Sequence, residues 1–268
     1  PASAPRSLSS SSIVSTSRMR GTFVIVTGSD ASRQAARIGS APFLLPAARI
    51  RPLSGWDPSM TKASASAGAT AMAGYASQPV APTREQAWDT LRKYTKGESL
   101  LRHALAVEAS TAAYARKFGE NEELWRVAAL LHDFDYEMHP TLDKHPQDGA
   151  PILRDEGYPE EVVETVLSHA EHLAMPRDTL LKKALFACDE LSGFVHACAL
   201  VRPTRLEGLE PKSVKKKLKQ PSFAAGVSRE DVYEGAELLE LDLDEHIANV
   251  IAALQPIADE LGLRSEAA

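Results

Sequence analysis

Apolar residues recur at helical spacing from residue 82 onward, and this pattern predicts a series of α-helices. Thr83 and Gln86 have the spacing of a capping box, so ordered structure is expected to begin near Pro82. Further helices are expected at Leu100–Phe118, Glu122–Leu131, Pro159–His172, Thr179–Leu200, Ser228–Glu240 and Leu243–Leu261. Because strand-like alternation is absent from this part of the chain, the sequence predicts an all-α bundle spanning residues 81–264.

The first 80 residues differ in composition, being rich in Ser, Ala, Pro and Arg without a sustained apolar period. Such a segment buries too little apolar surface to offset the entropy lost on ordering. Three interpretations stay open: a disordered tail, sequence upstream of a native start at Met60 or Met72, or a transit peptide. The run Thr22–Thr27 resembles a strand, but no glycine-rich phosphate loop follows it, so it is not counted as an element.

Charge is divided in the same way. Residues 1–80 carry eight basic and two acidic side chains, whereas the remaining 188 residues carry 22 basic and 34 acidic ones. A domain with a net charge of −12 repels a phosphate backbone, which argues against a nucleic-acid partner. All eight histidines, from His103 to His246, fall in this acidic part, so the chemistry is expected there.

The lack of long apolar runs and the low number of cysteines constrain the compartment and the partners of the protein. No apolar run approaches the roughly 18–20 residues that span a bilayer, so no membrane partner is expected. Cys188 and Cys198 are too few for a disulfide framework and are interpreted as buried thiols. The cytoplasm is therefore the predicted location, with an organelle as the alternative if residues 1–60 are a transit peptide. A homo-oligomer is compatible with the sequence.

Titratable residues interrupt the apolar helices at three places. His132 and Asp133 directly follow an apolar stretch that ends at Leu131, His103 lies early in its helix, and Asp189 lies on an apolar face. Burying a carboxylate is costly unless it is paired or bound to a cation. Each residue taken alone could be a cap or an ion-pair partner, but their coincidence favours a shared cation. Imidazole nitrogen with carboxylate oxygen suits Fe, Mn, Co, Ni or Zn.

The order of these residues resembles the H…HD…D signature of the HD-domain superfamily of metal-dependent phosphohydrolases. The matching segments are Arg102-His103, Leu131-His132-Asp133 and Ala187-Cys188-Asp189-Glu190-Leu191. The segments Lys144–Ala150 and Ser168–His172 resemble the two further histidine motifs of the HDIG subgroup. Residues Ser222–Asp231 resemble the tail of that subgroup's small bacterial members. The resemblance covers about residues 84–262 and implies a single HD-domain helical bundle.

The resemblance implies the ligands of a first divalent ion: His103, His132, Asp133 and Asp189. It also implies that Asp133 bridges to a second ion, which His145 and His169 complete. Two departures bear on the second position. Superfamily members often carry a lysine shortly after the HD pair, where this chain has acids at Asp135 and Glu137. Pro151 falls inside the helix that His145 is expected to open.

The implied function is a phosphomonoesterase or phosphodiesterase that acts on a small phosphorylated metabolite or nucleotide through a metal-activated hydroxide. Asp133 and Asp189 are the candidate catalytic residues. His172, Arg202 and Arg205 are candidate substrate-binding residues, because cationic side chains near the site can hold a phosphate. Two alternatives stay open: a diiron oxygenase of the same superfamily, and a metal-bound regulatory module without turnover.

Overall fold

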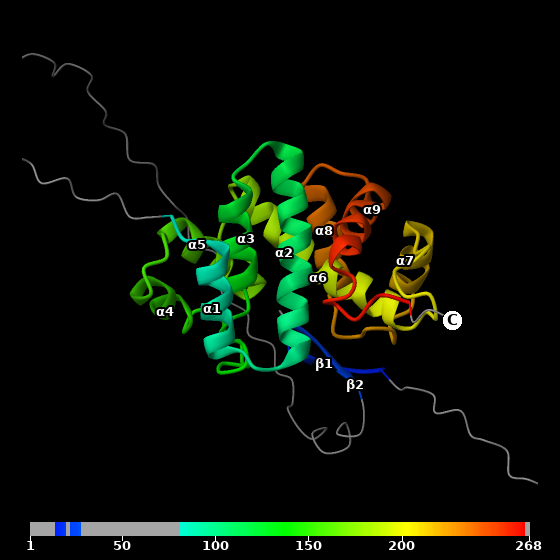
Figure 1. Cartoon of the computed structure of the whole chain (residues 1–268), viewed down its shortest axis with the longest axis horizontal. Coiled ribbons are helices and arrows are strands. Elements are labelled where there is room, and N and C mark those ends of the chain that lie inside the picture. The colour runs from blue at the N-terminus through cyan, green and yellow to red at the C-terminus, as the bar shows by residue number, and fades with distance from the viewer. Residues whose placement is uncertain (1–13, 20–21, 28–80, 266–268) are drawn as a thin grey trace, which may run out of the picture. The chain divides into compact units, whose positions relative to one another are not determined.

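The structure is a computed structural model that describes residues 14–19, 22–27 and 81–265 (Figure 1). Residues 81–265 are helical, which confirms the predicted all-α class for this domain. The α-helices are α1 (Arg84–Tyr94), α2 (Glu98–Phe118), α3 (Glu122–Leu131), α4 (Ala150–Asp155), α5 (Glu160–Ser168), α6 (Leu180–Leu200), α7 (Pro211–Leu218), α8 (Arg229–Leu238) and α9 (Leu243–Leu254). Two 3-10 helices, η1 (Glu171–Leu173) and η2 (Gln255–Ile257), complete this part of the chain.

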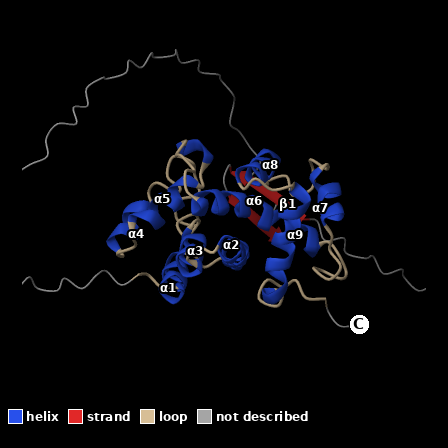
Figure 2. Cartoon of the chain, turned by 90° about the horizontal axis from the view of Figure 1, so that it is seen from above, coloured by secondary structure: helices blue, strands red, loops and turns tan. Residues whose placement is uncertain are grey.

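Two helices of 21 residues each, α2 and α6, pack against each other in the middle of the domain. Helix α3 packs on α2, and α1 and α5 pack on α3. Helices α8 and α9 pack on α6 (Figures 1 and 2). Leu130 and Leu131 of α3 and Leu185 and Leu191 of α6 are all fully buried. Burial of each such side chain stabilises the fold by about 1.5–3 kcal/mol. The two thiols, Cys188 and Cys198, are buried in α6, as predicted.

Local capping explains where most helices begin and end. Thr83 forms the predicted capping box with Gln86, and Asn121, Thr179 and Ser228 accept backbone N–H groups at the starts of α3, α6 and α8. Gly119 ends α2 in the left-handed conformation, with φ of 74°, where glycine has no steric penalty.

Two helices end earlier than the sequence predicted. Helix α5 ends at Ser168 and not at His172, because side chains bond the carbonyl groups that another helical turn would use. Ser168 donates to Thr165 O at 2.9 Å and His169 donates to Val166 O. Helix α9 ends at Leu254 and not at Leu261, and η2 contains Pro256, which has no N–H to continue the helical ladder.

The helix expected to start at His145 is also different. Helix α4 begins only at Ala150, and residues 142–149 form consecutive turns. Pro151 therefore lies in the first turn of α4, where a missing N–H costs nothing. His145 lies in the turns that precede the helix.

Helix α6 is held in register close to Asp189 by two contacts at Ala187. The Cα of Gly235 in α8 packs so closely that an added Cβ would lie 2.6 Å from Ala187 Cα. From α9, His246 Nε2 donates to Ala187 O at 3.0 Å, and its Nδ1 accepts from the Tyr114 hydroxyl at 2.6 Å. These contacts fix the segment of α6 that carries Asp189.

The N-terminal segment contains one element that its sequence pattern does not predict. Strands β1 (Val14–Met19) and β2 (Thr22–Thr27) form an antiparallel pair in which Val14 faces Thr27 and Met19 faces Thr22. The β-branched residues of Thr22–Thr27 favour an extended chain, which explains the difference. The expected disorder of the other residues in 1–80 lies outside the described residues. None of the described helices is long and apolar enough to cross a membrane.

Candidate metal centre

Three helices bring the first group of ligand-type side chains together. His103 lies in α2, His132 caps the C-terminus of α3 and Asp189 lies in the middle of α6. His103 Nε2 is 2.9 Å from Asp189 Oδ1, and His132 Nε2 is 3.2 Å from His103 Nε2 and 3.4 Å from Asp189 Oδ1. All three side chains are buried, and their ligand-type atoms lie within 4.8 Å of one another.

A second group consists of Asp133, His145 and His169. Asp133 follows the end of α3, His145 lies in the turns before α4, and His169 caps the C-terminus of α5. Asp133 Oδ1 is 3.2 Å from His145 Nε2 and 3.4 Å from His169 Nε2. The group is as deeply buried as the first one.

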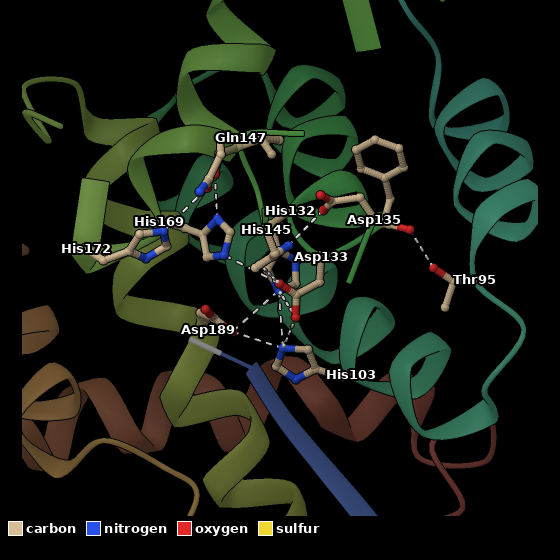
Figure 3. A network of polar contacts seen from close by, with 12 residues as sticks. Thr95, His103, His132, Asp133, Asp135, His145, Gln147, His169, His172 and Asp189 are labelled. Carbon is tan, nitrogen blue, oxygen red and sulfur yellow. Dashed lines mark hydrogen bonds and ion pairs between the residues drawn. The ribbon is translucent and has the colours of Figure 1, made fainter. Parts of the chain in front are cut away.

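Asp133 connects the two groups, because each of its oxygens faces a different one. Its Oδ1 faces the second group, while its Oδ2 lies 3.4 Å from His132 Nε2 and 3.8 Å from His103 Nε2. Figure 3 shows these side chains converging from several helices on one point. A carboxylate in this position can share its two oxygens between two cations.

Hydrogen bonds on the far side of the rings aim three of the histidines. His132 Nδ1 bonds to Ala129 O at 2.7 Å, and His169 Nδ1 bonds to Val166 O at 2.5 Å. His145 Nδ1 bonds to Asp135 Oδ1 at 2.8 Å. A carbonyl oxygen cannot donate, so the Nδ1 atoms of His132 and His169 carry protons. In the neutral ring this leaves the Nε2 lone pair directed into the cluster, as metal-binding imidazoles require.

Within the cluster, the charges of the Asp side chains shift the pKa of the histidines, and the histidines shift the pKa of the Asp side chains. Burial alone would lower the pKa of His132, but the carboxylates of Asp133 and Asp189 raise that pKa well above its ordinary value. Burial would likewise raise the pKa of both carboxyl groups, but His132 holds them well below their usual range. The pKa of His145 is raised to about 9 by Asp133 and Asp135 against the opposing effect of burial. A cation binding here therefore displaces protons from the histidines.

The donor atoms fit a divalent transition metal. Four imidazoles and two carboxylates form a mixed nitrogen and oxygen set of the kind that binds Fe, Mn, Co, Ni or Zn. The buried Nε2 atoms of His145 and His169 form no hydrogen bond in the described part of the chain, although both point at Asp133 Oδ1. A buried polar atom without a hydrogen bond is costly, and a metal ion would remove that cost.

The structure brings together all six residues implied as ligands, but not the proposed substrate-binding set. His172 lies in η1 at the edge of the cluster, exposed, with its Nε2 3.4 Å from Gln147 Oε1. Arg202 and Arg205 follow the C-terminus of α6. The part of this helix after Asp189 is about 16 Å long at the usual rise per residue. Arg202 donates to Glu207 O, and Arg205 donates to Leu200 O. Their guanidinium groups stabilise a local turn.

Two contributors to the site were not assigned a role from the sequence. In the sequence Asp135 stands out only as an acid where superfamily members often carry a lysine, yet it is fully buried and bonds to His145. Gln147 lies beside His172, and its Nε2 donates to Leu142 O at 2.8 Å, which directs Oε1 toward His172. The available signal for Asp135 was its place directly after Phe134, since an acid next to a buried aromatic residue needs a partner.

Fold and site together define an all-helical domain with two adjoining buried groups of His and Asp side chains whose spacing suits a metal ion. Residues 100–193 match the family model of the HD domain, and this stretch contains all six ligand-type residues. This match supports the HD-domain superfamily, whose members are in general metal-dependent hydrolases. The HDIG subgroup stays a prediction. No solved structure matches the chain.

Proposed function

We propose that the chain is a metal-dependent phosphohydrolase with a dinuclear centre that acts on a small phosphorylated metabolite or nucleotide. The observation that carries this proposal is the position of Asp133, with one oxygen toward each of two buried groups. Six ligand-type residues in two adjoining groups favour two ions over one. When bound, such ions polarise a phosphate ester and lower the pKa of a coordinated water.

In this proposal His103, His132, Asp133 and Asp189 hold the first ion, and Asp133, His145 and His169 hold the second. Asp133 and Asp189 are also the candidate catalytic carboxylates, because they are the two acids that belong to the ligand groups. They would orient the attacking water and accept its proton. No Ser or Cys nucleophile is needed for this chemistry.

Substrate contacts are proposed at the edge of the cluster. His172 is largely exposed there, beside Gln147, and its pKa is lowered by the partial burial of its ring and by the neighbouring histidines His145 and His169. A ring next to the second group can donate a hydrogen bond to a phosphate oxygen. Arg202 and Arg205 are not included, because their guanidinium groups bond to backbone carbonyl groups at the end of α6 and in the turn after it.

The test is metal analysis of anaerobically purified full-length protein, followed by assays with phosphomonoester and phosphodiester substrates and added Mn²⁺, Fe²⁺, Co²⁺ or Ni²⁺. We expect close to two metal equivalents and phosphate release without O₂ consumption. His132→Ala should lose both metal and activity, whereas His139→Ala, in the loop after the HD pair but in neither group, should keep them. O₂ uptake with oxidised product would instead identify an oxygenase, and metal binding without turnover would identify a regulatory module.

A further inference from the structure

The loop between α3 and α4 contains a buried carboxylate that belongs to neither ligand group. Asp135 has no exposed surface, and its Oδ1 lies 2.8 Å from His145 Nδ1. The opposite nitrogen of that ring, Nε2, lies 3.2 Å from Asp133 Oδ1. An ionised carboxylate cannot donate, so the bond to Asp135 places a proton on Nδ1, and in the neutral ring this leaves the Nε2 lone pair directed toward the second group.

His145 depends on this contact more than His132 and His169 depend on theirs. His132 and His169 each bond to a carbonyl three residues earlier in their own helix, so the helix that carries the ring also orients it. His145 lies in turns, and its Nδ1 bonds to a side chain ten residues away in the sequence. The direction of its ring is therefore set by where Asp135 lies.

Gly149 provides the space that Asp135 occupies. A Cβ added at Gly149 would lie 2.6 Å from Asp135 Cγ, 2.7 Å from its Oδ2 and 2.9 Å from its Cβ. The backbone of Gly149 is in the ordinary right-handed region, with φ of −76° and ψ of −31°. Any residue could adopt that backbone conformation, so the requirement for glycine comes from packing alone. The side chain of Asp135 fits only because Gly149 has none.

We propose that Asp135 is a positioning residue that aims His145 into the second metal position, and that Gly149 makes its placement possible. This rests on the proposed function only in requiring that the group of Asp133, His145 and His169 binds a metal ion. A carboxylate bonded to the far nitrogen of a ligating imidazole fixes the ring and raises its basicity, and removing such a partner weakens metal binding by about 10–100-fold. The first position has its own ligands and does not depend on Asp135.

The experiment compares two variants, Asp135→Asn and Asp135→Ala, by titrating metal-free full-length protein with Co²⁺ and following the visible absorption bands. Wild type should bind two equivalents in two resolvable steps. Asp135→Ala should weaken the second step by about 10–100-fold and leave the first within about threefold. Asp135→Asn keeps an acceptor oxygen without the charge, so its effect should be smaller. Glu137→Gln is the matched control, since Glu137 accepts from the backbone of Lys96 and Gly97 and not from a histidine.

A second measurement separates positioning from a general loss of structure. Nitrogen-15 NMR of the metal-free protein, with His145→Gln for assignment, should show the His145 ring protonated at Nδ1 in wild type and in Asp135→Asn. That signal should shift or disappear in Asp135→Ala and in Gly149→Ala, while the Nδ1 signal of His169 stays unchanged.

The inference is wrong if the second Co²⁺ step is unchanged in Asp135→Ala, if both steps weaken equally, or if wild type binds a single equivalent. Two-step binding that depends on Asp135 in a protein that hydrolyses no phosphate ester would contradict the proposed function and leave this inference intact.

Discussion

Six buried histidines occupy two regions of the helical domain and are used in different ways. His196 and His246, the packing histidines, join α6 to the C-terminal part of the chain. His246 bonds at both ring nitrogens, to Tyr114 and to Ala187 O, and His196 Nε2 bonds to Leu261 O at 3.1 Å. The cluster histidines, His103, His132, His145 and His169, instead direct Nε2 atoms at carboxylates and at one another.

Burial tends to lower the pKa of the histidines in both regions. Only in the cluster do neighbouring carboxylates oppose this effect and raise the pKa. Burial lowers the pKa of His196 and of His246 to about 4, so these rings are neutral parts of the core. The pKa of His132 and of His145 is raised by neighbouring Asp residues despite equal burial. Concentrating acids and bases in a dry interior costs stability unless a ligand uses them. Substitutions in the cluster should therefore affect metal binding, and those in the packing region should affect folding.

The largest effect is expected for Asp133→Ala. Because the two oxygens of Asp133 face different groups, the substitution removes a ligand from both positions. We expect affinity at each position to fall by more than about 100-fold, beyond the loss typical of a residue that only supports a ligand. Metal content after gel filtration and phosphate release should decline together. Asp143→Ala, an exposed acid of the same loop, is the control, and full metal occupancy in Asp133→Ala would mean that the HD pair is structural.

A smaller effect is expected when one group is altered at a time. His169→Ala should reduce the bound metal from about two equivalents to about one, because its Nε2, 3.4 Å from Asp133 Oδ1, belongs to the second group of ligand-type atoms. His103→Ala should remove the other equivalent, since its Nε2 meets Asp189 at 2.9 Å. Circular dichroism should show the helical content of wild type in both variants. If wild type saturates at one equivalent and His169→Ala only weakens substrate binding, the centre is mononuclear.

Most of the helical framework was predictable from the sequence because its signals are local. The capping box at Thr83, the terminal Gly119 and the apolar faces of α2, α3 and α6 depend on neighbours within one or two turns. The ends of α5 and α9 were not predictable from apolar period alone. At Ser168 and His169 side chains bond backbone carbonyls, and at Pro256 a missing N–H interrupts the ladder.

The order of the motifs was enough to name the six ligand-type residues. It was not enough to name the residues that position them. Asp135, Gly149 and His145 meet across turns whose path the sequence does not specify. Arg202 and Arg205 illustrate the opposite case, a prediction that rested on closeness in sequence. They follow the helix of Asp189 in sequence, but α6 extends for eleven residues after Asp189 and carries them away from the site. Proximity along a long helix is therefore a poor guide to proximity in space.

The smallest effect concerns the packing histidines and the dependence of folding on pH. Because the pKa of His246 is about 4 in the folded protein and its usual value is 6.5, the unfolded chain binds more protons between these values. This contribution to stability is complete above pH 6.5 and is lost as the pH falls toward 4. Between pH 7.5 and 5.5 one such histidine should reduce the free energy of unfolding by about 1 kcal/mol.

Replacing His246 with Gln should remove this part of the pH dependence, because the amide can bond in both directions but does not titrate. Urea unfolding of the metal-free protein, followed by circular dichroism at pH 7.5, 6.5 and 5.5, measures the slope for each variant. Tyr114→Phe removes the hydroxyl that bonds to His246 Nδ1, so it should lower stability at all three values while the slope persists. Both variants should still bind metal as wild type does, because His246→Gln keeps a donor for Ala187 O, Tyr114→Phe leaves that bond in place, and neither residue belongs to a ligand group. An unchanged slope in His246→Gln, or a loss of metal in either variant, would mean that the two regions are not separate in function.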